Sequence, residues 1–177
     1  MSAIHGKDEY GGFEVTIEAK CGAVVVPLRI DLTSGDIITP AAVDYSFSTL
    51  LEKKKITIRA YNIDALLAEK FETMITRGVG NTRSKDFYDV FIISKMYKIN
   101  FKDFAEAAIM TFTCRETSSY LDSRFSIIES IQKDRFMTEL WLRYQKANAF
   151  ARNITFEETI DSLRVLAEAI KKEDSLL

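Results

Sequence analysis

The stretch from residue 61 to residue 97 constrains the fold of this chain most, because charged residues interrupt its two apolar helical patterns. In the first pattern, Lys70 lies within about 60° of Ile63 and Met74 on a helical wheel. A lysine therefore lies inside the apolar stripe of the first helix. An isolated buried ammonium group is costly, so this lysine needs either an anionic partner or a lowered pKa.

The second pattern carries two carboxylates on one face. Asp86 and Asp89 are three residues apart on a helix that is otherwise apolar nearly all the way round, which predicts that both are partly buried. One interpretation is an internal ion pair between Lys70 and one of the two aspartates, which would join two adjacent helices. The other is a functional site. There, Lys70, Arg83 and Lys85 would face phosphates, while one aspartate would orient the lysine or accept a proton.

The composition is that of an ordinary globular protein. The chain has 177 residues, of which 47% are hydrophobic and 28% charged, so we expect one domain or one domain with a helical extension. The formal net charge of -2 provides no overall field that would attract nucleic acid. Any polyanion would therefore have to bind a local basic patch.

The cysteines and the apolar runs bear on the compartment. Cys21 and Cys114 show no metal-ligand spacing, and the single histidine, His5, cannot complete a site with them. We interpret both cysteines as reduced thiols. No apolar run reaches the ~18 residues that a membrane span needs, and the first residues lack the apolar region of a signal peptide. We therefore expect a soluble cytoplasmic protein that does not bind a membrane.

Two strands are predicted near the start of the chain. Residues 13–19 alternate between apolar and polar, as in a half-buried strand, and residues 23–32 are mostly apolar and β-branched. Gly22 allows a turn between them, so the pair is typical of an antiparallel hairpin. Pro27 removes one backbone donor, which favours an edge position or a bulge. Asp31, near the end of the second strand, would face either a cleft or solvent.

The remaining segments predict one more strand and then helices. No element is predicted before residue 12, residues 38–51 give only a weak signal, and residues 56–61 alternate like a strand. Glu69 and Glu72 project away from the apolar stripe of the first helix, so we expect both in solvent. The first helix is expected to begin at Asn62 and to end at Gly78 or Gly80. The expected starts of the later helices are Thr82 or Ser84 for the second, Asn100 for the third and a Thr155–Glu158 capping box for the last.

These elements predict an α+β fold. A small, mainly antiparallel sheet of about three strands would occupy residues 1–61, and about five helices would occupy residues 62–177. Such a small sheet is unusual on its own, which suggests that a further segment precedes residue 1. An unpaired sheet edge can pair with another chain, so we expect homo-oligomers.

Two motifs in the central stretch resemble the AbiEii family of nucleotidyltransferase toxins. Residues 68–72 read AEKFE and residues 83–89 read RSKDFYD. They are similar to the family's AEK helix and its R-x-K-D-x-Y-D motif, in the same order and spacing. Looser agreement extends from Tyr10 to the final helix, notably over residues 27–36 and 154–158. Members of this family are the toxins of type IV toxin-antitoxin and abortive-infection systems, which act in phage defence.

The resemblance implies part of a polymerase-β-type nucleotidyltransferase core with helices appended. It implies Mg²⁺ and a nucleoside triphosphate as cofactor and substrate, an RNA acceptor such as a tRNA 3′ end, and a cognate antitoxin as partner. By the same resemblance, Asp31 corresponds to a metal-binding carboxylate and Lys70 to the motif lysine that holds nucleotide phosphates. Asp86 or Asp89 corresponds to the motif aspartate, and Arg83 and Lys85 to positions on the phosphate or RNA side.

The chain departs from the family pattern at its start. The family has a Gly-Gly-Thr or Gly-Ser turn and then an Asp-x-Asp pair, whereas here Gly11-Gly12 precedes Phe13 and no Asp-x-Asp occurs. Three explanations stay open: a truncated chain, a second polypeptide that supplies the missing part, or loss of catalysis with binding retained. The chain is thus either an incomplete nucleotidyltransferase toxin or a non-catalytic module that binds nucleotide, RNA or a partner.

Overall fold

The fold combines two small antiparallel sheets with a helical region, which confirms the predicted α+β class. The computed structural model describes residues 2–4, 12–32, 35 and 37–174. Contacts within the chain divide it into two compact units, Met1–Ile37 and Ile38–Leu177. The functional division that we expect at residue 61 stays a prediction. None of the described helices is long and apolar enough to cross a membrane.

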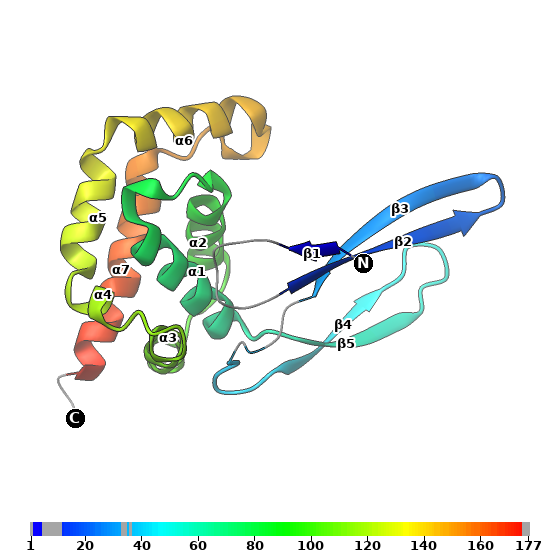
Figure 1. Ribbon diagram of the computed structural model, residues 1–177, viewed down its shortest axis with the longest axis horizontal. Helices are drawn as coiled ribbons and strands as arrows, with labels where there is room; N and C mark the ends of the chain where they lie inside the picture. Colours follow the sequence, from blue (N-terminus) through cyan, green and yellow to red (C-terminus); the bar gives the residue numbers. More distant parts are fainter. Residues whose placement is uncertain (1, 5–11, 33–34, 36, 175–177) are drawn as a thin grey trace. The chain divides into compact units, whose positions relative to one another are not determined.

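The first unit contains a three-stranded sheet in the order β1-β2-β3, with antiparallel neighbours (Figure 1). The strands are β1 (Ser2–Ile4), β2 (Gly12–Cys21) and β3 (Val24–Leu32). The predicted hairpin is confirmed, because β2 and β3 pair through a turn in which Gly22 has φ +57°. Pro27 lies on β3, the outer strand, as expected. β1 was not predicted, because a three-residue strand is too short to show alternation.

The two faces of the β2–β3 ribbon differ in chemistry. Phe13, Ile17 and Ile30 lie on the apolar face, yet each remains over 40% exposed, so the expected half-burial of this strand is wrong. The opposite face is mostly polar, and on it Glu14 of β2 is the direct partner of Asp31 of β3. Two carboxylates therefore face each other across the ribbon, because directly opposed residues project to the same side.

The second unit begins with a two-stranded antiparallel sheet. Its strands are β4 (Val43–Ser48) and β5 (Lys55–Ala60), with Tyr45 opposite Ile58. β5 confirms the third predicted strand, whereas β4 lies in the segment that gave only a weak signal. The single sheet of about three strands is thus corrected to two sheets with five strands among the described residues. Both sheets have unpaired edges, and self-association through them stays a prediction.

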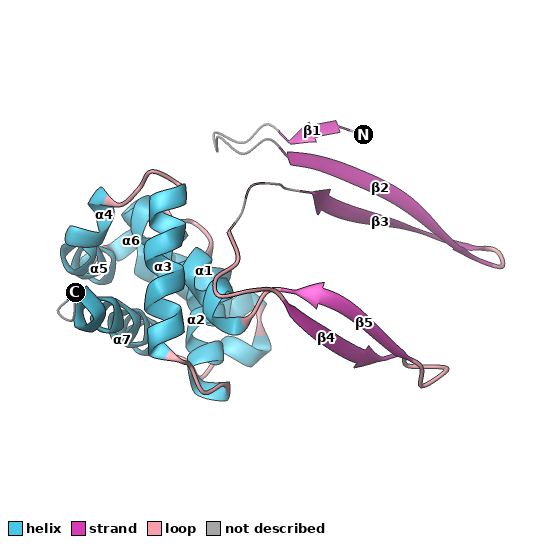
Figure 2. Cartoon of the chain, turned by 90° about the horizontal axis from the view of Figure 1, so that it is seen from below, coloured by secondary structure: helices cyan, strands magenta, loops and turns pink. Residues whose placement is uncertain are grey.

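The helices of the second unit pack around one hydrophobic core (Figure 2). Phe71, Phe104 and Trp141 are among its largest buried side chains, and α7 contacts α2, α3 and α5. The described residues form seven α-helices where about five were predicted, since α4 is only four residues long and the region after residue 117 is divided. The helices are α1 (Ile63–Arg77), η1 (Gly78–Gly80), α2 (Ser84–Met96), α3 (Phe101–Cys114), α4 (Ser119–Asp122), α5 (Arg124–Lys133), α6 (Arg135–Ala147), η2 (Ala149–Ala151) and α7 (Phe156–Asp174).

Three of the predicted helix starts are confirmed. The side chain of Asn62 accepts a backbone hydrogen bond at the start of α1, and that of Asn100 does so at the start of α3. At the start of α7, the Thr155 N–H donates to Glu158 and the Glu158 N–H donates to the Thr155 hydroxyl, which is a capping box. α1 ends at Gly78, which has φ +51°.

The predicted cap of α2 is wrong. Arg83 is the residue before this helix and its side chain makes no capping hydrogen bond, while Ser84 is already helical. Asn81 orders the turn before the helix, because its Oδ1 accepts the backbone N–H of Arg83 at 3.1 Å. A turn ordered two residues earlier leaves the side chain of Arg83 available for other contacts.

Candidate functional site

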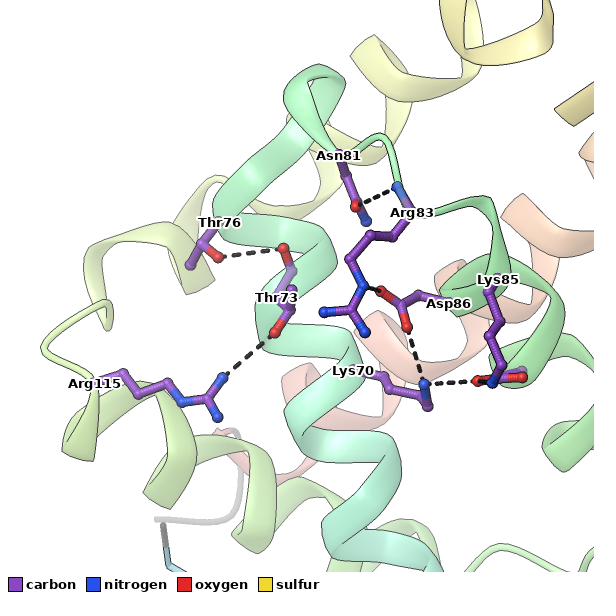
Figure 3. Close-up of polar contacts among 9 residues, drawn as sticks. Lys70, Thr73, Thr76, Asn81, Arg83, Lys85, Asp86 and Arg115 are labelled. Atoms are coloured by element: carbon purple, nitrogen blue, oxygen red, sulfur yellow. Dashed lines mark hydrogen bonds and ion pairs between the residues drawn. The ribbon is translucent and has the colours of Figure 1, made fainter. Parts of the chain in front are cut away.

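Helices α1 and α2 hold Lys70 against two carboxylates. Lys70 Nζ lies 3.0 Å from Asp86 Oδ1 and 2.8 Å from Asp89 Oδ2 (Figure 3). The sequence left open which aspartate meets the lysine, and the structure shows that both do. The side chain of Asp86 is only 3% exposed, and those of Lys70 and Asp89 are 16% exposed. The lysine predicted inside an apolar stripe is therefore neutralised by two partly or fully buried anions.

Two exposed cations complete this arrangement. Arg83 Nε lies 3.1 Å from Asp86 Oδ2, and Lys85 Nζ lies 2.5 Å from Asp89 Oδ2. Their side chains are 58% and 70% exposed, respectively. Each carboxylate thus links the buried lysine to one cation at the surface. We call these five residues the ion cluster; with three cations and two carboxylates, its formal charge is 3 − 2 = +1.

The turn between α1 and α2 positions the cluster. Gly78 ends α1 in the left-handed region, η1 follows, and the chain then returns so that α2 packs on α1. Asn81 is completely buried in this turn and orders the backbone at Arg83 through the hydrogen bond described above (Figure 3). The sequence does not single out Asn81, because a lone asparagine between a glycine and a helix is typical of any turn.

The ion pairs shift the pKa values of both buried partners. Burial alone would raise the pKa of Asp89, but hydrogen bonds from Lys70 and Lys85 outweigh it and lower that pKa below its ordinary value of 3.8. Burial alone would lower the pKa of Lys70, but hydrogen bonds to Asp89 and Asp86 outweigh it and raise that pKa above 10.5. Both groups are therefore charged at neutral pH.

These shifts predict how stability depends on pH. A lowered pKa makes Asp89 stabilising above 3.8, and this contribution is lost as the pH falls through its folded value. A raised pKa makes Lys70 stabilising below 10.5, and this contribution is lost as the pH rises through its folded value. Urea titrations across pH should show a stability plateau between these limits. The loss of stability at acid pH should be smaller in Asp89→Asn than in wild type. An identical loss in that variant would mean that Asp89 is not its source.

A third buried carboxylate, Glu72, lies on α1 and belongs to a separate group of contacts. Glu72 Oε2 accepts from Arg115 Nη1 at 2.7 Å, and Glu72 Oε1 accepts from the Thr117 hydroxyl at 2.9 Å. The expectation that Glu69 and Glu72 lie in solvent is wrong, because the side chain of Glu72 is 4% exposed and Glu69 is half-buried. Both partners, Arg115 and Thr117, follow the end of α3. Helical periodicity cannot reveal such a partner more than forty residues away.

The carboxylate expected to bind metal belongs to the other unit. Asp31 is exposed on β3, and its nearest carboxylate by register is Glu14. Among the residues that the structure describes, no group of three or more histidine, cysteine or acidic side chains forms a metal site. Mg²⁺ is commonly held by one or two carboxylates together with phosphate oxygens, so Asp31 and Glu14 fit this ion only as ligands shared with a nucleotide.

Comparison with known proteins assigns the family. The model of the nucleotidyl transferase AbiEii toxins of type IV toxin-antitoxin systems matches residues 2–169. The chain belongs to the AbiEii family. Searches among curated proteins and among solved structures each found no match. Family membership confirms the resemblance carried by the AEKFE and RSKDFYD segments and makes the chain a nucleotidyltransferase-like toxin, for which the family implies a nucleotide substrate and an antitoxin.

Proposed function

We propose that this chain binds a nucleoside triphosphate at the ion cluster and transfers a nucleotide to an RNA acceptor, such as a tRNA 3′ end. The observation that carries the proposal is the position of Arg83 and Lys85. Both are largely exposed, yet each is held at the surface by a buried aspartate. Cations fixed in this way can meet the phosphates of a nucleotide at a low cost in side-chain entropy.

Each residue of the ion cluster has a distinct part in this proposal. The guanidinium of Arg83 uses Nε toward Asp86, which leaves its two terminal nitrogens directed elsewhere for paired hydrogen bonds to a phosphate. Lys85 adds a second exposed charge, and the buried ammonium of Lys70 adds positive potential behind both. The lowered pKa of Asp89 makes it a weak proton acceptor, so we assign it to orienting Lys70 and Lys85.

Asp31 and Glu14, which belong to the first unit, are the carboxylates that would hold Mg²⁺. In nucleotidyl transfer, a bound Mg²⁺ ion neutralises triphosphate charge and activates the attacking hydroxyl. The two carboxylates stand directly opposite each other, so their mutual repulsion favours a cation between them.

The biological setting follows from the family. Nucleoside triphosphates and tRNA are cytoplasmic, so we place the toxin in the cytoplasm, under control of a cognate antitoxin and in defence against phage. The second candidate function is a non-catalytic module that binds nucleotide, RNA or a partner. It is favoured by a single observation, namely that the described residues supply two opposed carboxylates, Glu14 and Asp31, rather than a group of three metal ligands.

The first experiment is isothermal titration of the chain with each nucleoside triphosphate and Mg²⁺, beside the Lys85→Ala and Lys70→Ala variants. We expect Lys85→Ala to weaken binding about tenfold, since one charge-assisted phosphate contact is lost. Lys133→Ala is the matched control, because Lys133 is 71% exposed and pairs with a glutamate four residues earlier on α5. Lys70→Ala is informative only if circular dichroism shows that it folds, since Lys70 joins two helices.

The results of these measurements distinguish the proposed catalytic function from the non-catalytic module. No binding by the folded wild-type chain contradicts both a catalytic and a nucleotide-binding role. Binding that Lys85→Ala weakens, without transfer of a labelled nucleotide to tRNA, favours the non-catalytic module. Binding together with Mg²⁺-dependent transfer supports the proposed activity.

A further inference from the structure

Three aromatic rings meet at the surface on the α2 side of the ion cluster. Tyr88 of α2 lies 4.8 Å from Phe150 of η2 and 6.1 Å from Tyr144 of α6, measured between ring centroids. Tyr144 and Phe150 are 6.3 Å apart. We call these three residues the aromatic triad. Trp141, which is buried, stacks on Tyr144 at 5.5 Å and supports the triad from the core.

Burial within the core does not account for the whole triad. The two tyrosines are half-buried, but Phe150 is 60% exposed although it contacts both. An exposed phenyl ring that rests on two further rings is fixed in place and keeps a large apolar surface in water. Such a surface is suited to a flat, apolar ligand.

Charged residues of the ion cluster adjoin the triad. Lys85 lies one helical turn before Tyr88, and Asp89 follows Tyr88 directly on α2. Asp89 is close enough to Tyr144 that its charge, after burial, contributes to raising the pKa of that tyrosine. Arg152, which is exposed, follows Phe150 by two residues in the chain. Cations thus flank the aromatic surface from α2 and from the end of η2.

We propose that the aromatic triad stacks an unpaired base of the single-stranded RNA acceptor, while Lys85 and Arg152 meet neighbouring phosphates. Aromatic side chains beside cations are the usual means of binding single-stranded nucleic acid, because every base has a flat face that can stack. Flanking cations favour this occupant over an apolar protein segment, for which they would offer no partner. The inference rests on the proposed function only in naming RNA as the acceptor, since it requires no transfer step.

The test is fluorescence anisotropy with a labelled single-stranded RNA of about ten nucleotides. Phe150→Ala should weaken binding about tenfold, because one stacking surface is lost. Phe136→Ala is the matched control, since Phe136 is 48% exposed on α6, two helical turns from Tyr144, and should leave the affinity unchanged. An oligonucleotide with abasic sites keeps the phosphates but lacks bases, and it should bind wild type and Phe150→Ala equally weakly.

The results that overturn the proposal are distinct from failure of the proposed nucleotide site. Equal RNA affinity of wild type and Phe150→Ala, or equal loss in Phe150→Ala and Phe136→Ala, overturns it. Undiminished binding of the abasic strand also overturns it. If the folded wild type binds no RNA, the triad is better explained as a surface for a protein partner. The two proposed sites share Lys85, but Phe150→Ala leaves Lys85 in place and should still bind nucleotide like wild type, so failure of the triad is distinguishable from failure of the nucleotide site.

Discussion

Replacing Lys70 with methionine is expected to lower the free energy of unfolding by about 3–5 kcal/mol at neutral pH. The variant keeps the length of the side chain but leaves Asp86 and Asp89 without their shared cation. Asp86 is almost fully buried, and Arg83 reaches only one of its oxygens. Two neighbouring carboxylates would then repel each other in a site largely removed from water. Urea denaturation followed by circular dichroism measures the loss.

A pH series identifies the cause of that loss. In Lys70→Met, protonation of one aspartate relieves the repulsion, so the difference from wild type should shrink as the pH falls toward about 4. The control is Lys85→Met, which removes a cation that is 70% exposed and should cost under about 1 kcal/mol. A constant difference between Lys70→Met and wild type at all pH values would contradict a charge-based mechanism and indicate lost packing instead.

Local signals in the sequence predicted the elements whose causes are themselves local. The Asn62 cap, the Thr155–Glu158 box and the edge position of Pro27 each depend on a few adjacent residues, and all three are present. The predicted cap of α2 was wrong because the structure there does not depend on adjacent residues alone. Thr82 and Ser84 could each cap the helix, but no side chain does so, and buried Asn81 orders the turn before it instead, which no local pattern records.

In the candidate site too, some features follow from local sequence and others depend on how the helices pack. Periodicity placed Lys70 and the two aspartates within apolar helical patterns, and an internal ion pair between them was one of the two interpretations that the sequence left open. The structure contains this pair. That both aspartates share the lysine follows from the packing of α2 on α1, which the sequence does not specify. The aromatic triad joins residues 88, 144 and 150 from three elements, and no spacing rule connects positions so far apart.

Arg115→Met is the second substitution with a large expected effect. Arg115 Nη1 donates to Glu72 Oε2, and the side chain of Glu72 is 4% exposed, so its loss leaves a buried carboxylate with the Thr117 hydroxyl as a remaining donor. We expect a loss of about 3 kcal/mol, at the low end for a broken buried pair, because Arg115 itself is 25% exposed and water can enter in its place. Chemical denaturation at neutral pH measures this change.

Two comparisons test whether the unpaired charge of Glu72 causes the loss of stability in Arg115→Met. Thr117→Val removes a single hydrogen bond to Glu72 and should lower the free energy of unfolding by about 1 kcal/mol. If Thr117→Val lost more stability than Arg115→Met, Arg115 would not be the main partner of Glu72. Lys70 and Glu72 are two residues apart on α1 and project about 200° apart, so the two buried carboxylate clusters share no side chain. The losses in Lys70→Met and Arg115→Met should therefore add in the double variant to within about 0.5 kcal/mol. A clearly smaller sum would mean that α1 already loosens as one unit when either cluster is broken.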